Sequence, residues 1–269
     1  MKRFKKFHRK VGRSIVHLSV ATATVAACGL AMAQSKASAE DHAAADSWNA
    51  KAAHEDRFRD DVMAFIAEDR EHSPPPGGIV FVGSSTIRFW DTLNEQFSHL
   101  PIVRRGFGGA RMADVAKYCD SLVTPYKPKM VVVYGGDNDL NEGATAQDVF
   151  DSFVSFVKVV RKKLPTTRIA FVSIKPSPSR PKIMESTKVA NAMVQDFVNT
   201  TPNMDYIDTF DAMLGEDGKP RREYFGPDDL HMNRKGYALW RQVVAPHIEA
   251  VASNFPRTDP DQGVTASRR

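Results

Sequence analysis

A serine directly after an apolar run is the first candidate for chemistry in this sequence. Residues 79–82 read Ile-Val-Phe-Val, which is typical of a short buried strand, and Gly83-Ser84-Ser85 follows at once. In open α/β sheets, ligands bind outside the carboxyl ends of the strands, so Ser85 stands where a nucleophile would be useful. Serine is also common in ordinary turns, so this role depends on partners elsewhere in the chain.

A histidine near the carboxyl terminus supplies a possible general base. His231 closes the segment Asp228-Asp229-Leu230-His231, which precedes the expected last helix. An aspartate three residues before a histidine can accept its Nδ1–H, which leaves Nε2 to take a proton from a serine. Asp228 fits this geometry better than Asp229, because side chains two apart on a turn seldom face each other. The alternative is an Asp–His pair that only caps the entry to the helix.

Two glycine-rich turns could supply hydrogen-bond donors. Residues 105–109 read Arg-Gly-Phe-Gly-Gly and residues 135–139 read Gly-Gly-Asp-Asn-Asp, each after an expected strand. Glycine permits backbone conformations that aim N–H groups into a cavity, and Asn138 adds an amide donor. The oxyanion of an acyl-transfer intermediate needs such donors. A phosphate loop is disfavoured, because Arg111 replaces the third glycine of a dinucleotide fingerprint and no Gly-Lys-Ser/Thr follows.

The elements that must position these residues alternate along the chain. Strands that alternate with helices predict a parallel sheet. The clearest helix starts at Thr145 as N-cap, with Asp148 in the capping-box position and an apolar stripe behind it. The expected strands are 79–82, 102–103, 130–134, 169–174 and 204–207, and the first and last helices are expected near 48–70 and 233–251.

The order of these motifs resembles the SGNH, or GDSL-type, esterase and lipase family. The Gly-Ser-Ser variant is similar to the platelet-activating-factor acetylhydrolase-like bacterial branch, and the resemblance covers about Trp48 to Val251. It implies a three-layer α/β/α sandwich with a five-stranded parallel sheet, flavodoxin-like in order. Ser84 replaces the aspartate of the name-giving tetrapeptide, Thr86 its leucine, and Arg104 an asparagine common in the family. These departures affect substrate preference more than chemistry.

The resemblance also assigns roles to single residues. Ser85 would be the nucleophile, and His231, oriented by Asp228, the base. The oxyanion hole would combine the backbone N–H groups of Ser85 and Gly109 with the Asn138 side chain.

Residues that shape the substrate pocket are harder to choose. Trp90, Phe107 and Arg111 are candidates, although Trp90 fits plain core equally well. The loop 175–181, Lys-Pro-Ser-Pro-Ser-Arg-Pro, either shapes the mouth of the site or is a stiff connection. No Gly-x-Ser-x-Gly elbow surrounds Ser85, and neither His-Glu-x-x-His nor cysteine–histidine metal spacing occurs. We therefore expect no metal and no cofactor.

Charge and composition limit the partners. The chain has 269 residues and a formal charge of +5, but seven basic residues lie within the first thirteen positions. The remaining 30 basic residues meet 32 acidic ones, which argues against a nucleic-acid partner. The expected partner is an ester of a small alcohol, glycan or lipid. The oligomeric state stays open.

The amino-terminal segment has the form of an export signal. A basic start, an apolar stretch and Ala31-Met32-Ala33 predict cleavage after residue 33, with Ala39 as a second possible site. Lipidation at Cys28 and an uncleaved membrane helix are the less favoured alternatives. We expect a signal over 1–33, a disordered spacer over 34–46, a single hydrolase domain over 47–253 and a flexible tail over 254–269. Cleavage would leave Cys119 as a lone, buried thiol in a protein that is periplasmic or secreted.

The hypothesis from sequence is a serine esterase for short, acetyl-like esters. The short chain leaves little room for a lid, which disfavours long-chain lipase action. The alternatives are a lysophospholipase or thioesterase with the same site, and a non-catalytic module that binds envelope glycans or lipids.

Overall fold

The computed structural model divides the chain into two units, Met1–Ser47 and Trp48–Arg269, and describes residues 57–252. The predictions for the signal, the spacer, Cys28, Trp48 and the tail lie outside the described residues. No helix among residues 57–252 has the length and apolarity needed to cross a bilayer.

Five parallel strands form one sheet in the order β2-β1-β3-β4-β5. This arrangement confirms the predicted α/β fold with a flavodoxin-like parallel sheet. Two strands, β3 and β5, match their predicted bounds, while β2 extends three residues further than expected. The strands are β1 (Ile79–Gly83), β2 (Ile102–Gly106), β3 (Met130–Tyr134), β4 (Arg168–Val172) and β5 (Met204–Ile207).

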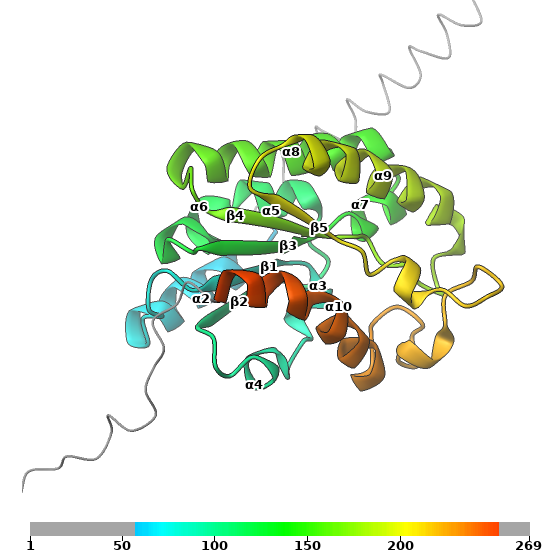
Figure 1. Ribbon diagram of the computed structural model, residues 1–269, viewed down its shortest axis with the longest axis horizontal. Coiled ribbons are helices and arrows are strands. Elements are labelled where there is room, and N and C mark those ends of the chain that lie inside the picture. Colours follow the sequence, from blue (N-terminus) through cyan, green and yellow to red (C-terminus); the bar gives the residue numbers. More distant parts are fainter. Residues whose placement is uncertain (1–56, 253–269) are drawn as a thin grey trace, which may run out of the picture. The chain divides into compact units, whose positions relative to one another are not determined.

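Helices cover both faces of the sheet. Figure 1 shows α8 and α9 on one side and α10 on the other. Because successive strand residues point to opposite faces, β1 places Val80 and Val82 in one core and Ile79 and Phe81 in the other. The helices are α2 (Arg59–Glu71), α3 (Ser85–Arg88), α4 (Leu93–Gln96), α5 (Met112–Lys117), α6 (Cys119–Leu122), α7 (Asp137–Asn141), α8 (Ala146–Lys163), α9 (Met184–Thr200) and α10 (Arg234–Ala252), with short 3-10 turns at Thr124–Tyr126, Pro181–Ile183, Asp211–Met213 and Arg222–Tyr224.

Only the first two residues of β2 were predicted, because its second half carries two arginines. Arg105 is buried, yet its guanidinium is satisfied by Asp69 and by the Tyr126 hydroxyl, to which its Nε donates at 2.8 Å. Arg104 lies near the surface and pairs with Asp91 at 3.1 Å. An edge strand that is covered by α2 can therefore hold arginines that would be costly in the centre of the sheet.

The capping box of α8 confirms the clearest helix prediction. Thr145 Oγ1 accepts the Asp148 N–H at 3.1 Å, and the Asp148 carboxylate accepts the Thr145 N–H at 2.8 Å. Val149, Phe153 and Phe156 are buried against the sheet, as the apolar stripe predicts.

The strand order brings three loops to one edge of the sheet. Gly83 at the end of β1 is in register with Gly106 of β2 and with Tyr134 of β3. The chain adds β2 on one side of β1 and then β3 on the other side. Such a topological switch point opens a crevice at the carboxyl ends of the strands. The segments after β1, β2 and β3 therefore meet at that crevice.

Candidate active site

Ser85 is the first residue of α3, directly beyond the end of β1. Ser84 precedes the helix in an extended conformation and is fully buried, while Ser85 is partly exposed. A first-turn N–H has no acceptor within its own helix. The Ser85 N–H also donates to no backbone carbonyl of the described residues, so it can face a ligand.

The loop before α10 presents His231. The Asp228 Oδ1 atom accepts the backbone N–H groups of Leu230 at 3.1 Å and His231 at 3.0 Å, which closes a tight turn. Helix capping is done by another residue, because Asn233 Oδ1 accepts the Lys235 N–H at 2.8 Å. Asp228 and His231 are therefore not needed as a helix cap.

The structure brings Ser85, His231 and Asp228 together in one chain of contacts. His231 Nε2 lies 3.0 Å from Ser85 Oγ, and His231 Nδ1 lies 2.5 Å from Asp228 Oδ2. Asp229 instead pairs with Arg222 at 2.7 Å, so Asp228 is the carboxylate that contacts the imidazole. Burial acts to raise the pKa of Asp228, but hydrogen bonds from His231 and the turn N–H groups outweigh it and lower that pKa to about 2.

Gly109 lies in a turn that only glycine fits well. Its φ of +76° is in the left-handed region, and a Cβ there would come within 2.8 Å of the Arg57 guanidinium. Arg57 Nη2 donates to the Gly109 carbonyl at 3.0 Å. The Gly109 N–H donates to no backbone carbonyl of the described residues, and like that of Ser85 it can serve a ligand.

Asn138 is held in one orientation on the first turn of α7. Its Nδ2 donates to the Ala110 carbonyl at 3.0 Å, and its Oδ1 accepts from Arg180 Nη2 at 2.9 Å. An amide nitrogen carries two N–H groups, so one donor remains after the Ala110 bond. The bond to Ala110 also links Asn138 to the turn that carries Gly109.

Two buried carboxylates bind the segments that carry or contact these donors. Both Asp139 oxygens accept the Met112 N–H, at 2.9 and 3.0 Å, which fixes the start of α5 just after the Gly109 turn. Burial raises the pKa of Asp139 to about 7. Asp137 pairs with Lys175 at 3.3 Å and with Arg180 at 3.2 Å, and these cations overcome burial and lower its pKa.

The three pocket candidates prove to be structural, which corrects that expectation. Trp90 and Phe107 have no exposed surface and belong to the two cores, where Trp90 stacks on Tyr237 with ring centroids 5.6 Å apart. Arg111 is buried, and its Nε donates to Asp114 at 3.0 Å beside the start of α5.

Sequence reasoning did not single out Phe89, which lies at the site. Its ring stands edge to face against the His231 imidazole, with centroids 4.9 Å apart, and it is 43% exposed. The only signal in the sequence is an aromatic residue one helical turn after Ser85.

Among residues 57–252, no group of three or more His, Cys, Asp or Glu side chains is placed to hold a metal ion. Cys119 is fully buried in α6, and burial raises the pKa of its thiol to about 12.

The sheet order places a serine, a histidine and an aspartate in contact at its carboxyl edge, which is the arrangement of a Ser-His-Asp triad. The chain belongs to the GDSL-like lipase/acylhydrolase family, whose model matches residues 80–239, and this confirms the resemblance seen in the motifs. It is thus a member of a family of esterases and acylhydrolases. No curated protein matches the sequence.

Solved structures share the fold at low sequence identity. A candidate platelet activating factor from Streptococcus pneumonia is 19% identical, with a TM-score of 0.62 over 70% of this chain and 92% of that one. A GDSL-like lipase from Bacteroides thetaiotaomicron VPI-5482 is 17% identical, with a TM-score of 0.61 over 70% and 97% of the two chains. A family 3 carbohydrate esterase from Clostridium thermocellum is 16% identical, with a TM-score of 0.52 over 65% and 98%.

Proposed function

We propose that this protein is a serine esterase that removes short acyl groups from esters through an acyl-enzyme on Ser85. The observation that carries the proposal is the contact of Ser85 Oγ with His231 Nε2 at 3.0 Å. A serine hydroxyl becomes a useful nucleophile when an imidazole can take its proton, and Asp228 stabilises the imidazolium that forms.

The reaction then runs in two halves. In the first, Ser85 Oγ attacks the ester carbonyl while His231 takes its proton, and the oxyanion is bound by the Ser85 N–H, the Gly109 N–H and the second N–H of Asn138. The intermediate collapses, the C–O bond breaks, and His231 returns the proton to the leaving alcohol. In the second half, His231 removes a proton from water, which attacks the acyl-enzyme. The bond between the acyl carbon and Ser85 Oγ then breaks, His231 returns the proton to Ser85, and the acid is released.

The alcohol side of the ester must lie beside His231, since that residue protonates the leaving oxygen. Phe89 flanks the imidazole and keeps much of its ring exposed. An exposed aromatic ring offers an apolar surface to the C–H face of a sugar or to a small alcohol. The likeness in fold to the Clostridium thermocellum carbohydrate esterase supports sugar esters as the substrate class.

Export remains part of the proposal. It is supported by the basic start, the apolar stretch and the small-residue site ending at Ala33. Mass spectrometry of the protein from the culture medium or periplasm of an expressing bacterium tests it. An unprocessed chain found only in the cytoplasm contradicts export.

The central experiment compares Ser85→Ala with its neighbour variant Ser84→Ala in p-nitrophenyl acetate turnover. Ser84 is a good control, because its buried hydroxyl makes no hydrogen bond to the described residues. We expect Ser84→Ala to keep its rate and Ser85→Ala to lose about 10⁴-fold or more. Equal rates for wild type and Ser85→Ala refute the serine mechanism and favour a binding module.

A substrate series tests the finer part of the proposal. The wild-type protein is given p-nitrophenyl esters of rising acyl length, acetylated xylosides and a lysophospholipid. We expect kcat/KM to be highest for acetyl esters and to fall with acyl length. If kcat/KM is highest for long acyl chains or for the lysophospholipid, the proposal of a short-chain esterase is wrong and the lysophospholipase alternative holds.

A further inference from the structure

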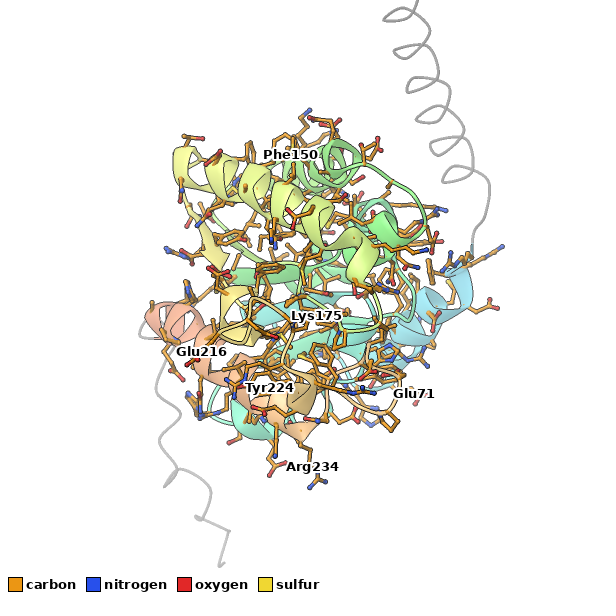
Figure 2. The ribbon with its side chains drawn as sticks, turned by 90° about the vertical axis from the view of Figure 1, so that its right-hand side faces the viewer. Glu71, Phe150, Lys175, Glu216, Tyr224 and Arg234 are labelled. Atoms are coloured by element: carbon orange, nitrogen blue, oxygen red, sulfur yellow. The ribbon has the colours of Figure 1, made fainter. Side chains whose placement is uncertain are left out.

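The loop between β4 and α9 contacts both halves of the active site through two adjacent residues. Ser179 donates from its N–H at 3.1 Å and from its hydroxyl at 3.0 Å to the carbonyl of Asp229, next to Asp228. Arg180, the next residue, reaches Asn138 on α7. Lys175, at the start of this loop, is buried and is labelled near the centre of Figure 2.

We propose that Arg180 is a positioning residue that fixes the Asn138 amide with its N–H donors toward the reacting carbonyl. This inference deepens the proposed function and rests on it. Arg180 does not touch the reacting atoms and acts only through Asn138.

The hydrogen-bonding pattern of the amide carries the argument. A guanidinium has donors and no acceptor, so only the Oδ1 side of Asn138 can face it favourably. Arg180 Nη2 donates to Oδ1 at 2.9 Å, while Nδ2 is turned toward the Ala110 carbonyl at 3.0 Å. Rotating the amide by half a turn would break both bonds and set N–H against N–H. Arg180 and Ala110 therefore permit one orientation of the donor.

The guanidinium is itself almost buried and faces a carboxylate. Its side chain is 11% exposed, and Nη1 lies 3.2 Å from Asp137, the residue before Asn138. Lys175 Nζ lies 3.3 Å from the same Asp137 oxygen and donates to Ser177 Oγ at 2.9 Å. One carboxylate thus faces two basic side chains, and burial lowers the pKa of one of them, Lys175.

The positive charge of Arg180 also strengthens the donor. A cation bonded to Oδ1 polarises the amide and makes its N–H groups better hydrogen-bond donors. The benefit is larger when negative charge develops on the carbonyl oxygen than in the bound ester. The effect of Arg180 should therefore fall on kcat and leave KM nearly unchanged.

The test is a double-mutant cycle between Arg180→Met and Asn138→Ala in the full chain, with p-nitrophenyl acetate as substrate. We expect Arg180→Met to lower kcat by about 10- to 100-fold with KM within about twofold. In the Asn138→Ala background the same change should cost less than about threefold, because its target is gone. Equal losses in both backgrounds, or a loss confined to KM, overturn the proposal.

Two further variants separate positioning from stability. Arg180→Lys keeps the charge and one hydrogen bond, so kcat should lie between wild type and Arg180→Met. Arg161, at the opposite edge of the sheet, holds a carbonyl in a similar way, with Nη2 donating to Asn203 at 2.9 Å. Arg161→Met should lower the melting temperature without changing kcat. If it lowers kcat as much as Arg180→Met does, the effect of Arg180 is one of stability.

A structural readout is independent of the esterase proposal. If wild type and Ser85→Ala turn over equally, the proposed function fails, but the orientation of Asn138 can still be measured. The ¹⁵N–¹H signals of the Asn138 side-chain amide should shift or broaden in Arg180→Lys, which serves if Arg180→Met does not fold. Unchanged signals overturn the positioning role.

Discussion

The two halves of the active site meet water differently. In the proton-transfer half, the side chains of Asp228 and His231 are 49% and 33% exposed. In the oxyanion half, Asn138 is 7% exposed and the supporting Asp139 only 1%. A base that serves leaving alcohols and water needs access to solvent, whereas donors to an oxyanion work best when fixed before the charge develops. The buried polar contacts of the site therefore hold the oxyanion donors.

Within the buried half, the pKa values of two nearby carboxylates shift in opposite directions. Burial acts to raise the pKa of both, but Asp137 faces Lys175 and Arg180, which lower its pKa. Asp139 accepts only backbone N–H groups and lies near the carboxylates of Asp137 and Asp114, so its pKa stays raised. Burial is thus offset where a carboxylate is paired directly with cations and is not offset where it is bonded only to backbone N–H groups.

The largest expected effect comes from breaking the exposed half. His231→Ala removes the base for both half-reactions and should lower kcat by about 10⁴-fold or more. His99→Ala is the control, because His99 forms an exposed pair with Glu249 at 2.9 Å and has no contact with the site. Turnover of p-nitrophenyl acetate is the measurement. Similar rates for both variants contradict the role of His231.

A smaller effect is expected from breaking the buried half. Asn138→Ala should lower kcat by about 10²- to 10³-fold, because one oxyanion donor is lost while the nucleophile and base remain. Asn138→Asp separates the two functions of the side chain, since its carboxylate can still bond Arg180 but donates nothing. We expect Asn138→Asp to be no better than Asn138→Ala. A kcat near wild type in either variant excludes Asn138 as a donor.

The fold was predictable because its signals are local. The apolar run 130–134 indicates a strand, and the Thr145–Asp148 capping box indicates the start of a helix, each within a few residues. The end of β2 was missed because Arg105 depends on Asp69 and Tyr126, which are 36 and 21 residues away in sequence. A charged residue in a strand becomes acceptable only once its distant partner is in place.

The site residues also differ in whether their signals are local in the sequence or depend on distant partners. Ser85 and Asn138 follow expected strands, and the order of their motifs and that of His231 resembles the GDSL-type family, so their meeting at one sheet edge could be predicted. The pocket could not, because Phe89 and Trp90 are adjacent in sequence just after α3, yet Phe89 is exposed and Trp90 is fully buried. Arg180 was visible only as part of a proline-rich loop, because its partners Asp137 and Asn138 are 43 and 42 residues earlier in the sequence.

The smallest expected effect concerns stability and sharpens the contrast between the two buried carboxylates. Burial raises the pKa of Asp139 to about 7, whereas an unfolded carboxyl ionises near pH 3.9. The folded state therefore keeps a proton that the unfolded state releases between these values. Stability from this group is complete below about pH 4 and is lost as pH rises through 7. From pH 5 to pH 8 the loss is roughly 2 to 3 kcal/mol.

Asp139→Asn removes this titration, and its Oδ1 can still accept the Met112 N–H. Urea unfolding at pH 5 and pH 8 should show the variant gaining roughly 2 to 3 kcal/mol on wild type between the two pH values. Asp137→Asn is the opposite case. The lowered pKa of Asp137 means that its contribution is present above about pH 4 and lost at lower pH, so its removal destabilises at both test values. If the free-energy difference between Asp139→Asn and wild type is the same at pH 5 and pH 8, Asp139 is ionised in the fold throughout, and burial does not govern its pKa.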